Sequence, residues 1–400
     1  MKFQFAFHRD YPKELTLPWA NPLDKWDDRL VVDVSRGISR HLVKFVVHDA
    51  NVYAIKEINE NIAKKEFKWL RVLYDLQLPV VQPIGLVTER DSSIQSDDAK
   101  ALLVTRYLEQ SIPYRNVVVQ GVTQSKLYKM LDALSELFVR LHLAGFYWGD
   151  CSLSNTLFRQ DAGRFAAYLV DAETGEHHSQ LSDGQRQQDL LMAEQNVAGE
   201  FMDVEAGFGL PPNTSAGELV DYLLSKYEQL WNEINHVDIF SVEESYRIQE
   251  RVSRLHDLGF DVEEMQIETI DEGHQLRIQP RVVEPWFHKR RLQTLTGLEV
   301  EENQARRLLN DLREFRVKTR CEMSVPLPET LIAYRWLTEC YQALLMKVPE
   351  KIKIKLGEAE TYHQLLEHRW FESEKSGYNV KTDDLINSFI QHFESTDLPH

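Results

Sequence analysis

Residues 141–158 read LHLAGFYWGDCSLSNTLF, and this stretch decides the fold. It begins inside a longer segment, residues 125–144, where apolar residues recur at the spacing of a buried helix until a glycine closes it. A polar loop follows, with Asp150 and Asn155 five positions apart. Next comes a strand pattern, AAYLVDAE, that ends in Asp171. The succession predicts a long buried helix, a polar loop and a hairpin.

The chain before this stretch has the pattern of strands. Residues 29–58 contain three runs rich in β-branched residues, separated by SRGIS and DAN, which indicates an antiparallel meander. An amphipathic helix is predicted at 61–76, and two strands, PIGLVTE and ALLVTRYL, follow it. Because helices and strands do not alternate regularly, the sequence predicts an α+β fold, not a doubly wound sheet.

The overall composition is typical of a globular protein of more than one domain. The 400 residues are 43% hydrophobic and 27% charged, and the formal net charge is -17. This charge argues against a protein that coats nucleic acid or binds an anionic membrane. The three cysteines are widely separated and odd in number, which argues against a disulfide framework. No run approaches the roughly 18–20 apolar residues of a membrane span, and no signal-peptide core is visible, so we expect a cytoplasmic protein.

The texture of the chain changes at FGLPPNTSAGE, residues 208–218, which we interpret as a boundary. The chain beyond it is mainly helical in pattern, with one hairpin at MQIETIDEGHQLRIQP. The predicted division is an N-terminal extension at 1–28, an α+β domain at 29–206 with lobes of about 29–108 and 109–206, and a mainly helical domain at 215–400.

Phosphoryl transfer needs a cation at the phosphates, a carboxylate that holds this cation, metal ligands, and a carboxylate at the nucleophile. Lys56 in Ala-Ile-Lys, on the third predicted strand, is the candidate cation. Glu66, on the apolar side of the helix that follows, is its candidate partner; Glu57 and Glu60 compete but precede that face. Taken alone, Lys56 is equally explained as an edge-strand lysine in solvent.

The loop and the hairpin supply the remaining groups. Asp150 is the candidate base that accepts the proton of an attacking hydroxyl, and Asn155 follows it in the D-x-x-x-x-N spacing of a kinase catalytic loop. Asn155 and Asp171 are the predicted Mg²⁺ ligands. Each residue alone is explained by an ordinary turn or strand end, and the hypothesis depends on their agreement in order and context.

Five further residues are predicted to bind the nucleotide. Ser35, Gly37 and Ser39 lie in the turn where a kinase carries its phosphate-covering loop, although one glycine there is a weak signal. Tyr107 and Leu108 end the strand ALLVTRYL. The predicted cofactors are therefore ATP and Mg²⁺.

With these motifs, residues 29–202 resemble the bacterial lipopolysaccharide (Kdo/WaaP-type) kinases and the related Rio and aminoglycoside kinase-like proteins. The shared feature is a G-D-x-x-x-x-N loop in place of H-R-D. The resemblance implies a bilobal protein-kinase-like fold that uses ATP and Mg²⁺. The remainder, with VVEPWFHKRRLQTLTGLEVEENQARRLLNDL and LEHRWFESEK, resembles a bacterial family of unknown function that joins such a half to a helical domain.

Two departures from the kinase pattern bear on activity. Trp148 stands where the loop usually begins with His, and Ser152 stands where protein kinases place a phosphate-holding Lys. No A-P-E segment closes a long activation loop after Asp171, so we expect a sugar or small-molecule hydroxyl as acceptor in preference to a protein. A nucleotide-binding pseudokinase that acts as a scaffold is the alternative, and transfer of AMP is a third chemistry open to this fold.

The helical domain contains a basic cluster, His288-Lys289-Arg290-Arg291, before a helix pattern. A nucleic-acid reader needs such a helix, but glutamates and aspartates surround this one. We therefore expect the domain to have a structural role or to contact a protein partner, and not to bind nucleic acid.

Overall fold

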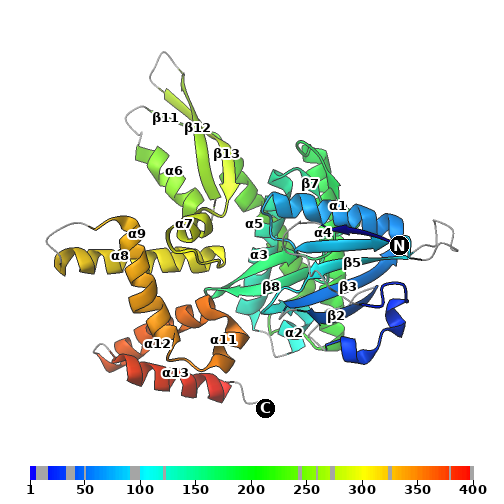
Figure 1. Cartoon of the computed structure of the whole chain (residues 1–400). Coiled ribbons are helices and arrows are strands. Elements are labelled where there is room, and N and C mark those ends of the chain that lie inside the picture. Colours follow the sequence, from blue (N-terminus) through cyan, green and yellow to red (C-terminus); the bar gives the residue numbers. More distant parts are fainter. Residues whose placement is uncertain are drawn as a thin grey trace. The chain divides into compact units, whose positions relative to one another are not determined.

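The computed structural model describes most of the chain, and its contacts divide the chain into two compact units (Figure 1). The first unit comprises residues 1–159 and 165–230, and the second comprises 160–164 and 231–400. No helix in the described part of the chain is long and apolar enough to cross a membrane. The described residues are 1–5, 17–32, 41–48, 51–90, 100–119, 123–241, 246–257, 260–270, 275–322, 327–377 and 380–396.

A five-stranded antiparallel sheet begins the first unit (Figure 1). The helix that covers it, α1 (Glu60–Asp75), begins at Asn59, whose side chain accepts hydrogen bonds from two backbone N–H groups of the first turn. The predicted helix and the strands on either side of it are confirmed. In spatial order the strands are β1 (Lys2–Phe5), β4 (Pro83–Thr88), β5 (Lys100–Arg106), β3 (Asn51–Asn59) and β2 (Leu42–His48).

The meander prediction is wrong for its first strand. Asp28–Leu30 forms a short 3-10 turn, and the two valines after it are in no strand, although Val32 N–H donates to the Phe45 carbonyl (2.9 Å). The opposite edge of the sheet is filled by β1, which pairs with β4 from Lys2 to Phe5. The fifth strand of the sheet therefore comes from the start of the chain and lies next to β4, and not next to β2 where the meander prediction had placed a strand.

The register of the strands separates a core face from a cavity face. Val43, Lys56 and Leu103 lie in one cross-strand row. Ile55 points the other way and joins a buried cluster with Leu23 of the N-terminal segment. Since side chains alternate along a strand, this core fixes Lys56 on the opposite face.

The helical lobe of the first unit is built around α3 (Gln124–Leu143), whose apolar residues are buried as the sequence predicts. Gly145 ends this helix with a left-handed φ of 75°, and a side chain there would lie 2.2 Å from the His178 carbonyl oxygen. Glycine is therefore required at this turn. The other elements of the lobe are β6 (Ser111–Pro113), α2 (Tyr114–Val119), β7 (Phe146–Tyr147), β8 (Thr156–Asp161), β9 (Arg164–Leu169), β10 (Glu176–His177) and α4 (Asp183–Gly207).

A further helix, α5 (Ala216–Asn235), packs in the first unit up to Leu230. Its Tyr222 hydroxyl donates to Asp132 (2.8 Å), and Ser135 of α3 donates to the Leu223 carbonyl (3.1 Å). The boundary expected at residues 208–218 lies at the start of this helix. The first unit extends to Leu230, so most of α5 belongs to the same unit as the α+β part.

The second unit is mainly helical, as predicted, and it contains the predicted hairpin. β12 (Phe260–Ile270) pairs with β13 (Gln275–Pro285), β11 (Asp238–Ser241) joins them, and the predicted turn at 271–273 lies outside the described residues. Of the helices of this unit, those from residue 287 onward pack around Trp336, Tyr341 and Tyr362, and the one before them contacts β12. They are α6 (Tyr246–Asp257), α7 (Phe287–Thr296), α8 (Glu302–Glu322), α9 (Glu329–Trp336), which runs through a π-helical turn (Leu337–Gln342) into α10 (Ala343–Leu345), α11 (Glu350–Leu356), α12 (Glu358–Ser376) and α13 (Thr382–Thr396).

Candidate active site

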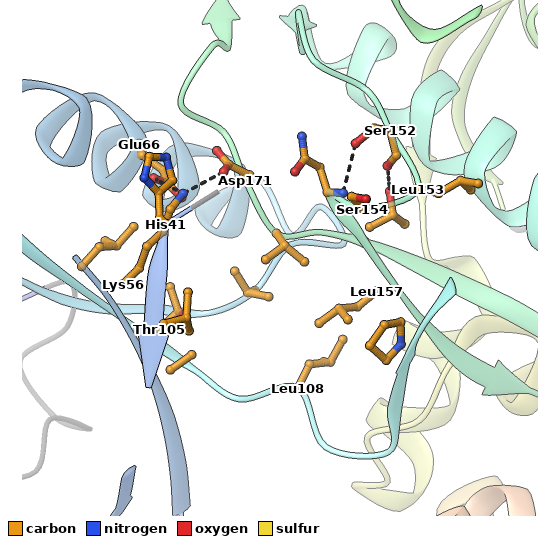
Figure 2. A pocket seen from close by; sticks show the side chains of 18 of the residues that line it. His41, Lys56, Glu66, Thr105, Leu108, Ser152, Leu153, Ser154, Leu157 and Asp171 are labelled. Carbon is orange, nitrogen blue, oxygen red and sulfur yellow. Dashed lines mark hydrogen bonds and ion pairs between the residues drawn. The ribbon is translucent and has the colours of Figure 1, made fainter. Parts of the chain in front are cut away.

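Three charged side chains that are far apart in the sequence meet in the first unit (Figure 2). Lys56 Nζ lies 3.0 Å from Glu66 Oε2 and 2.7 Å from Asp171 Oδ2. Strand β3 carries the lysine, α1 carries the glutamate, and the aspartate follows β9. Glu57 and Glu60 are engaged elsewhere, with Arg90 (2.6 Å) and Lys64 (2.7 Å). Glu66 is thus the carboxylate on α1 that meets Lys56.

The surroundings of these groups shift their protonation equilibria. Burial and the neighbouring Asp171 carboxylate raise the pKa of Glu66 to about 8, although the Lys56 ammonium opposes this. Burial acts to lower the pKa of Lys56, but Glu66 and Asp171 outweigh it and raise that pKa overall. The raised pKa of Glu66 reflects the excess negative charge that two ionised carboxylates would place around one buried ammonium, and a bound cation would relieve it.

The loop after α3 holds its aspartate by amide groups. Asn155 Nδ2 donates to both the backbone oxygen and Oδ2 of Asp150, each at 3.0 Å. Ser152 Oγ accepts from Asn155 N–H (3.1 Å) and so closes the loop on itself. This serine therefore serves the shape of the loop at the position where protein kinases carry a Lys.

Trp148 connects this loop to the metal-ligand candidate. Its ring is fully buried, and its indole N–H donates to the backbone carbonyl of Asp171 (3.0 Å). The departure from His at this position keeps a ring N–H donor. Gly149, the next residue, has a left-handed φ of 75°, a conformation that glycine adopts without strain.

Three polar residues of α4 hold the loop, and the sequence analysis did not identify them. Asp189, fully buried, accepts from Trp148 N–H (2.6 Å) and Gly149 N–H (2.8 Å). Asn196 donates to Asp150 Oδ1 (3.0 Å), and Glu200 accepts from the backbone N–H of Leu153 (2.6 Å) and Ser154 (2.9 Å). The three lie on one helical face, since they are seven and four positions apart. The local sequence carried no signal for them: Asp189, for example, follows Gln188 and precedes Leu190.

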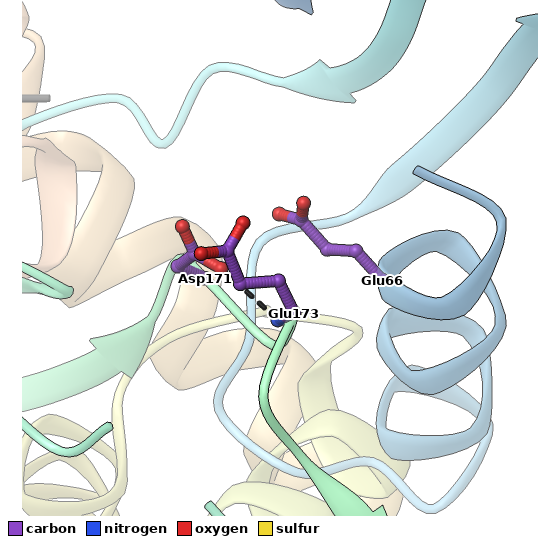
Figure 3. A group of neighbouring side chains, drawn as sticks. All are labelled: Glu66, Asp171 and Glu173. Atoms are coloured by element: carbon purple, nitrogen blue, oxygen red, sulfur yellow. Dashed lines mark hydrogen bonds between the residues drawn. The ribbon is translucent and has the colours of Figure 1, made fainter. Parts of the chain in front are cut away.

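A third carboxylate, Glu173, lies near the carboxylates of Glu66 and Asp171 (Figure 3). One oxygen each of Glu66, Asp171 and Glu173 lie within 4.8 Å of one another. Glu173 Oε2 is buried and accepts no hydrogen bond from the described residues, and it lies 3.3 Å from His41 Nε2. Three carboxylates gathered at one place are suited to a hard divalent cation such as Mg²⁺.

Lys56, Glu66 and Asp171 line one cavity of about 730 Å³, a volume suited to a small-molecule cofactor. Tyr107 and Leu108 line it, whereas Ser35, Gly37 and Ser39 lie outside the described residues. The apolar wall is made by Val43, Phe45, Ala54, Val81, Leu103, Leu108, Leu157 and Val170, and the polar end includes Lys56, Glu66, Asp150, Asn155, Asp171, Asn196 and Glu200.

Comparison with known families agrees with this geometry. Residues 39–201 match the lipopolysaccharide kinase (Kdo/WaaP) family. Residues 229–393 match a domain of unknown function, DUF4032. Both parts of the predicted resemblance are thus confirmed, and the first unit is a kinase-like α+β fold whose sheet-rich and helical lobes both line the cavity.

Many solved structures are also similar to the chain. One, described as WaaP in complex with acyl carrier protein, is 13% identical, with a TM-score of 0.35. The match covers 56% of this chain and 89% of that one. No curated protein matches the chain.

Two members of the basic cluster in the second unit, His288 and Arg291, contact acidic side chains. His288 Nδ1 lies 2.7 Å from Glu302 Oε1, and Arg291 lies 2.8 Å from Glu329 Oε2. His288 is also buried. These ion pairs give the cluster a structural role within α7 and its neighbours.

Proposed function

We propose that the Kdo/WaaP-like unit is an ATP- and Mg²⁺-dependent phosphotransferase that moves the γ-phosphate to a hydroxyl group of a sugar or another small molecule. The observation that carries this proposal is the contact of Lys56 with both Glu66 and Asp171 at the end of a cavity that Asp150 and Asn155 also line. Five side chains from three stretches of the sequence thus meet at one cavity, which supports a site for a nucleoside triphosphate.

Each residue has a role in this proposal. Lys56, oriented by Glu66, would hold the α- and β-phosphates, and Asp150 would orient the acceptor hydroxyl and take its proton. Asp171, Glu173 and the Asn155 side-chain oxygen would hold Mg²⁺, which neutralises charge that develops on the phosphates. The Nδ2 of Asn155 is bound to Asp150, so its Oδ1 is the atom left for a metal.

Two features support a small acceptor over a protein. Only residues 172–182 separate Asp171 from α4, so no long peptide-docking segment intervenes. Glu200 of α4 lines the cavity together with Asp150, so this helix occupies the space next to the proposed base. The family match supports a kinase-like phosphotransferase in general, and the acceptor class is our proposal.

The first prediction tests this function through Asp150. Replacement by Ala or Asn should lower phosphate transfer from ATP by about 10²–10⁴-fold, because the mutant lacks the group that positions and deprotonates the acceptor. Radiolabelled ATP with Mg²⁺ measures transfer and release of phosphate. Glu194→Gln, an exposed change on α4, is the control. An unchanged rate in Asp150→Ala would remove Asp150 from the mechanism, and mass spectrometry of products separates phosphate from AMP transfer.

A nucleotide-binding pseudokinase is the second candidate, and one observation favours it. Ser152 stands where protein kinases carry the Lys that holds the phosphate, and its hydroxyl oxygen accepts a hydrogen bond from Asn155 N–H within the loop. Titration calorimetry with ATP and Mg²⁺ separates the two candidates. Binding that Asp171→Ala abolishes, with no product over hours, supports the pseudokinase; transfer that depends on Asp150 supports the enzyme.

A further inference from the structure

We propose that Asn196 of α4 is a positioning residue that fixes the carboxylate of Asp150 for catalysis. This inference rests on the phosphotransferase function proposed above and assigns part of the reaction to a helix outside the kinase motifs. The observation is a direct contact: Asn196 Nδ2 donates to Asp150 Oδ1 (3.0 Å) and to the Cys151 carbonyl (3.2 Å).

The contact adds a second restraint to the Asp150 carboxylate, since the loop itself binds one of the two carboxylate oxygens through Asn155. Asn155, within the loop, donates to Oδ2 of Asp150, whereas Asn196 donates to Oδ1 from a separate element. Two amides on the two oxygens set the rotation of the carboxylate about its terminal bond. A base must present one oxygen within about 2.6–3.2 Å of the acceptor hydroxyl, so this rotation decides whether proton transfer is productive.

The helix that carries Asn196 is itself rigidly placed. Ala193 and Val197, beside it on α4, are fully buried. Asp189 and Glu200, one to two turns away on the same face, bind the backbone of the loop before and after Asp150. Any displacement of this face would therefore move Asp150 together with its neighbours. Asn196 is the member of the face that touches the carboxylate.

A purely structural role for Asn196 makes a different prediction. If its bond to the Cys151 carbonyl mattered most, its loss would loosen the whole loop, weaken nucleotide binding and reduce stability. If its bond to Asp150 matters, its loss acts through Asp150 alone. The two roles thus differ in which kinetic constant changes and in whether the effect needs Asp150.

The experiment measures phosphate release from ATP with Mg²⁺ by the full chain. Asn196→Leu, which removes the donor, should lower kcat by about 10–100-fold and leave the KM for ATP within about twofold. In the double variant Asp150→Ala/Asn196→Leu, the rate should stay within about twofold of Asp150→Ala, because Asn196 has nothing left to position. Gln195→Leu, at the exposed neighbour, should match the wild type.

Several outcomes would overturn the proposal. They are a wild-type kcat in Asn196→Leu, a raised KM with kcat unchanged, or losses that multiply in the double variant. If Asn196→Leu does not fold, Asn196→Asp keeps the shape and removes the donor, and a wild-type kcat there is equally decisive. If the wild type itself releases no phosphate, the proposed function fails, and crystal structures still decide the inference: an Asp150 carboxylate unmoved in Asn196→Asp refutes it.

Discussion

At the scale of single residues, Trp148 is the departure from the kinase pattern that most affects the expected activity. Its indole N–H holds the Asp171 carbonyl, so the ring connects the base loop to the metal-ligand candidate. We predict that Trp148→Phe loses about 1–3 kcal/mol of stability, because a buried carbonyl loses its donor. It should also lower the rate of phosphate transfer. Urea unfolding and radiolabelled ATP measure the two effects, and a Trp148→Phe protein equal to the wild type in both would contradict this role.

Glu173 yields a second prediction at this scale. Replacement by Gln keeps the shape of the side chain and removes one of three carboxylates around Lys56. We predict roughly tenfold weaker Mg²⁺ binding in the presence of ADP, because a metal ligand, or a group that orients one, contributes at this level. Calorimetric titration with Mg²⁺ measures it, with the exposed Glu205→Gln as control. Equal Mg²⁺ affinity in both variants would place Glu173 outside the metal site.

The sequence predicts some of these residues and not others for a physical reason. The group around Lys56 could be found because each member sits in a recognisable local context whose order is that of a kinase. Asn196 and Glu200 could not, since helical periodicity tells which residues share a face but not which loop that face meets. The same holds for Asp189, whose burial is known only from the structure.

At the scale of elements, the contact between α3, α4 and α5 makes stability depend on pH. His142 of α3 lies between the Tyr227 hydroxyl (2.7 Å) and Asp189 (3.2 Å), and burial lowers its pKa in spite of that carboxylate. The unfolded chain therefore binds this proton more readily than the folded one. The contribution of neutral His142 to stability is present above the ordinary histidine pKa of about 6.5 and is lost as the pH falls below it.

We accordingly predict that the free energy of unfolding falls between about pH 7 and pH 5.5 more steeply for the wild type than for His142→Gln. Glutamine offers an amide in place of the ring and does not titrate. Denaturant unfolding at several pH values measures the difference, which should shrink as the pH falls. A difference independent of pH would mean that His142 is protonated alike in both states.

The order of the strands in the sheet could not be predicted from local sequence patterns, although most of the elements could. Helix α3 and strands β2 to β5 follow from periodicity, because their apolar faces are set by neighbouring residues. β1 pairs with β4 across some eighty positions of sequence, and no local pattern records that partner. Conversely, the β-branched run that predicted a strand beside β2 forms a short 3-10 turn at Asp28–Leu30, and Val31 and Val32 after it are in no strand.

At the scale of the whole molecule, the division into two compact units predicts that nucleotide binding changes the melting temperature of only one of them. Among the described residues, those that line the cavity all belong to the first unit. The texture of residues 208–218 indicated a boundary, but the contacts of α5 extend the first unit to Leu230, because Tyr227 and Leu223 are buried there. The composition of a loop predicts where the chain turns, but the core in which a helix is buried depends on contacts that the loop does not indicate.

A ligand that binds only the folded first unit should stabilise that unit alone. At a hundredfold excess over its Kd, Mg²⁺-ADP adds about 2.7 kcal/mol, which for a unit of this size raises its melting temperature by roughly 5–10 °C. We predict that scanning calorimetry of the full chain shows this shift in one transition and none in the other. Lys56→Ala should abolish the shift, because the cation that meets the phosphates is gone. Equal shifts in both transitions, or a shift that survives in Lys56→Ala, would contradict nucleotide binding at this cavity.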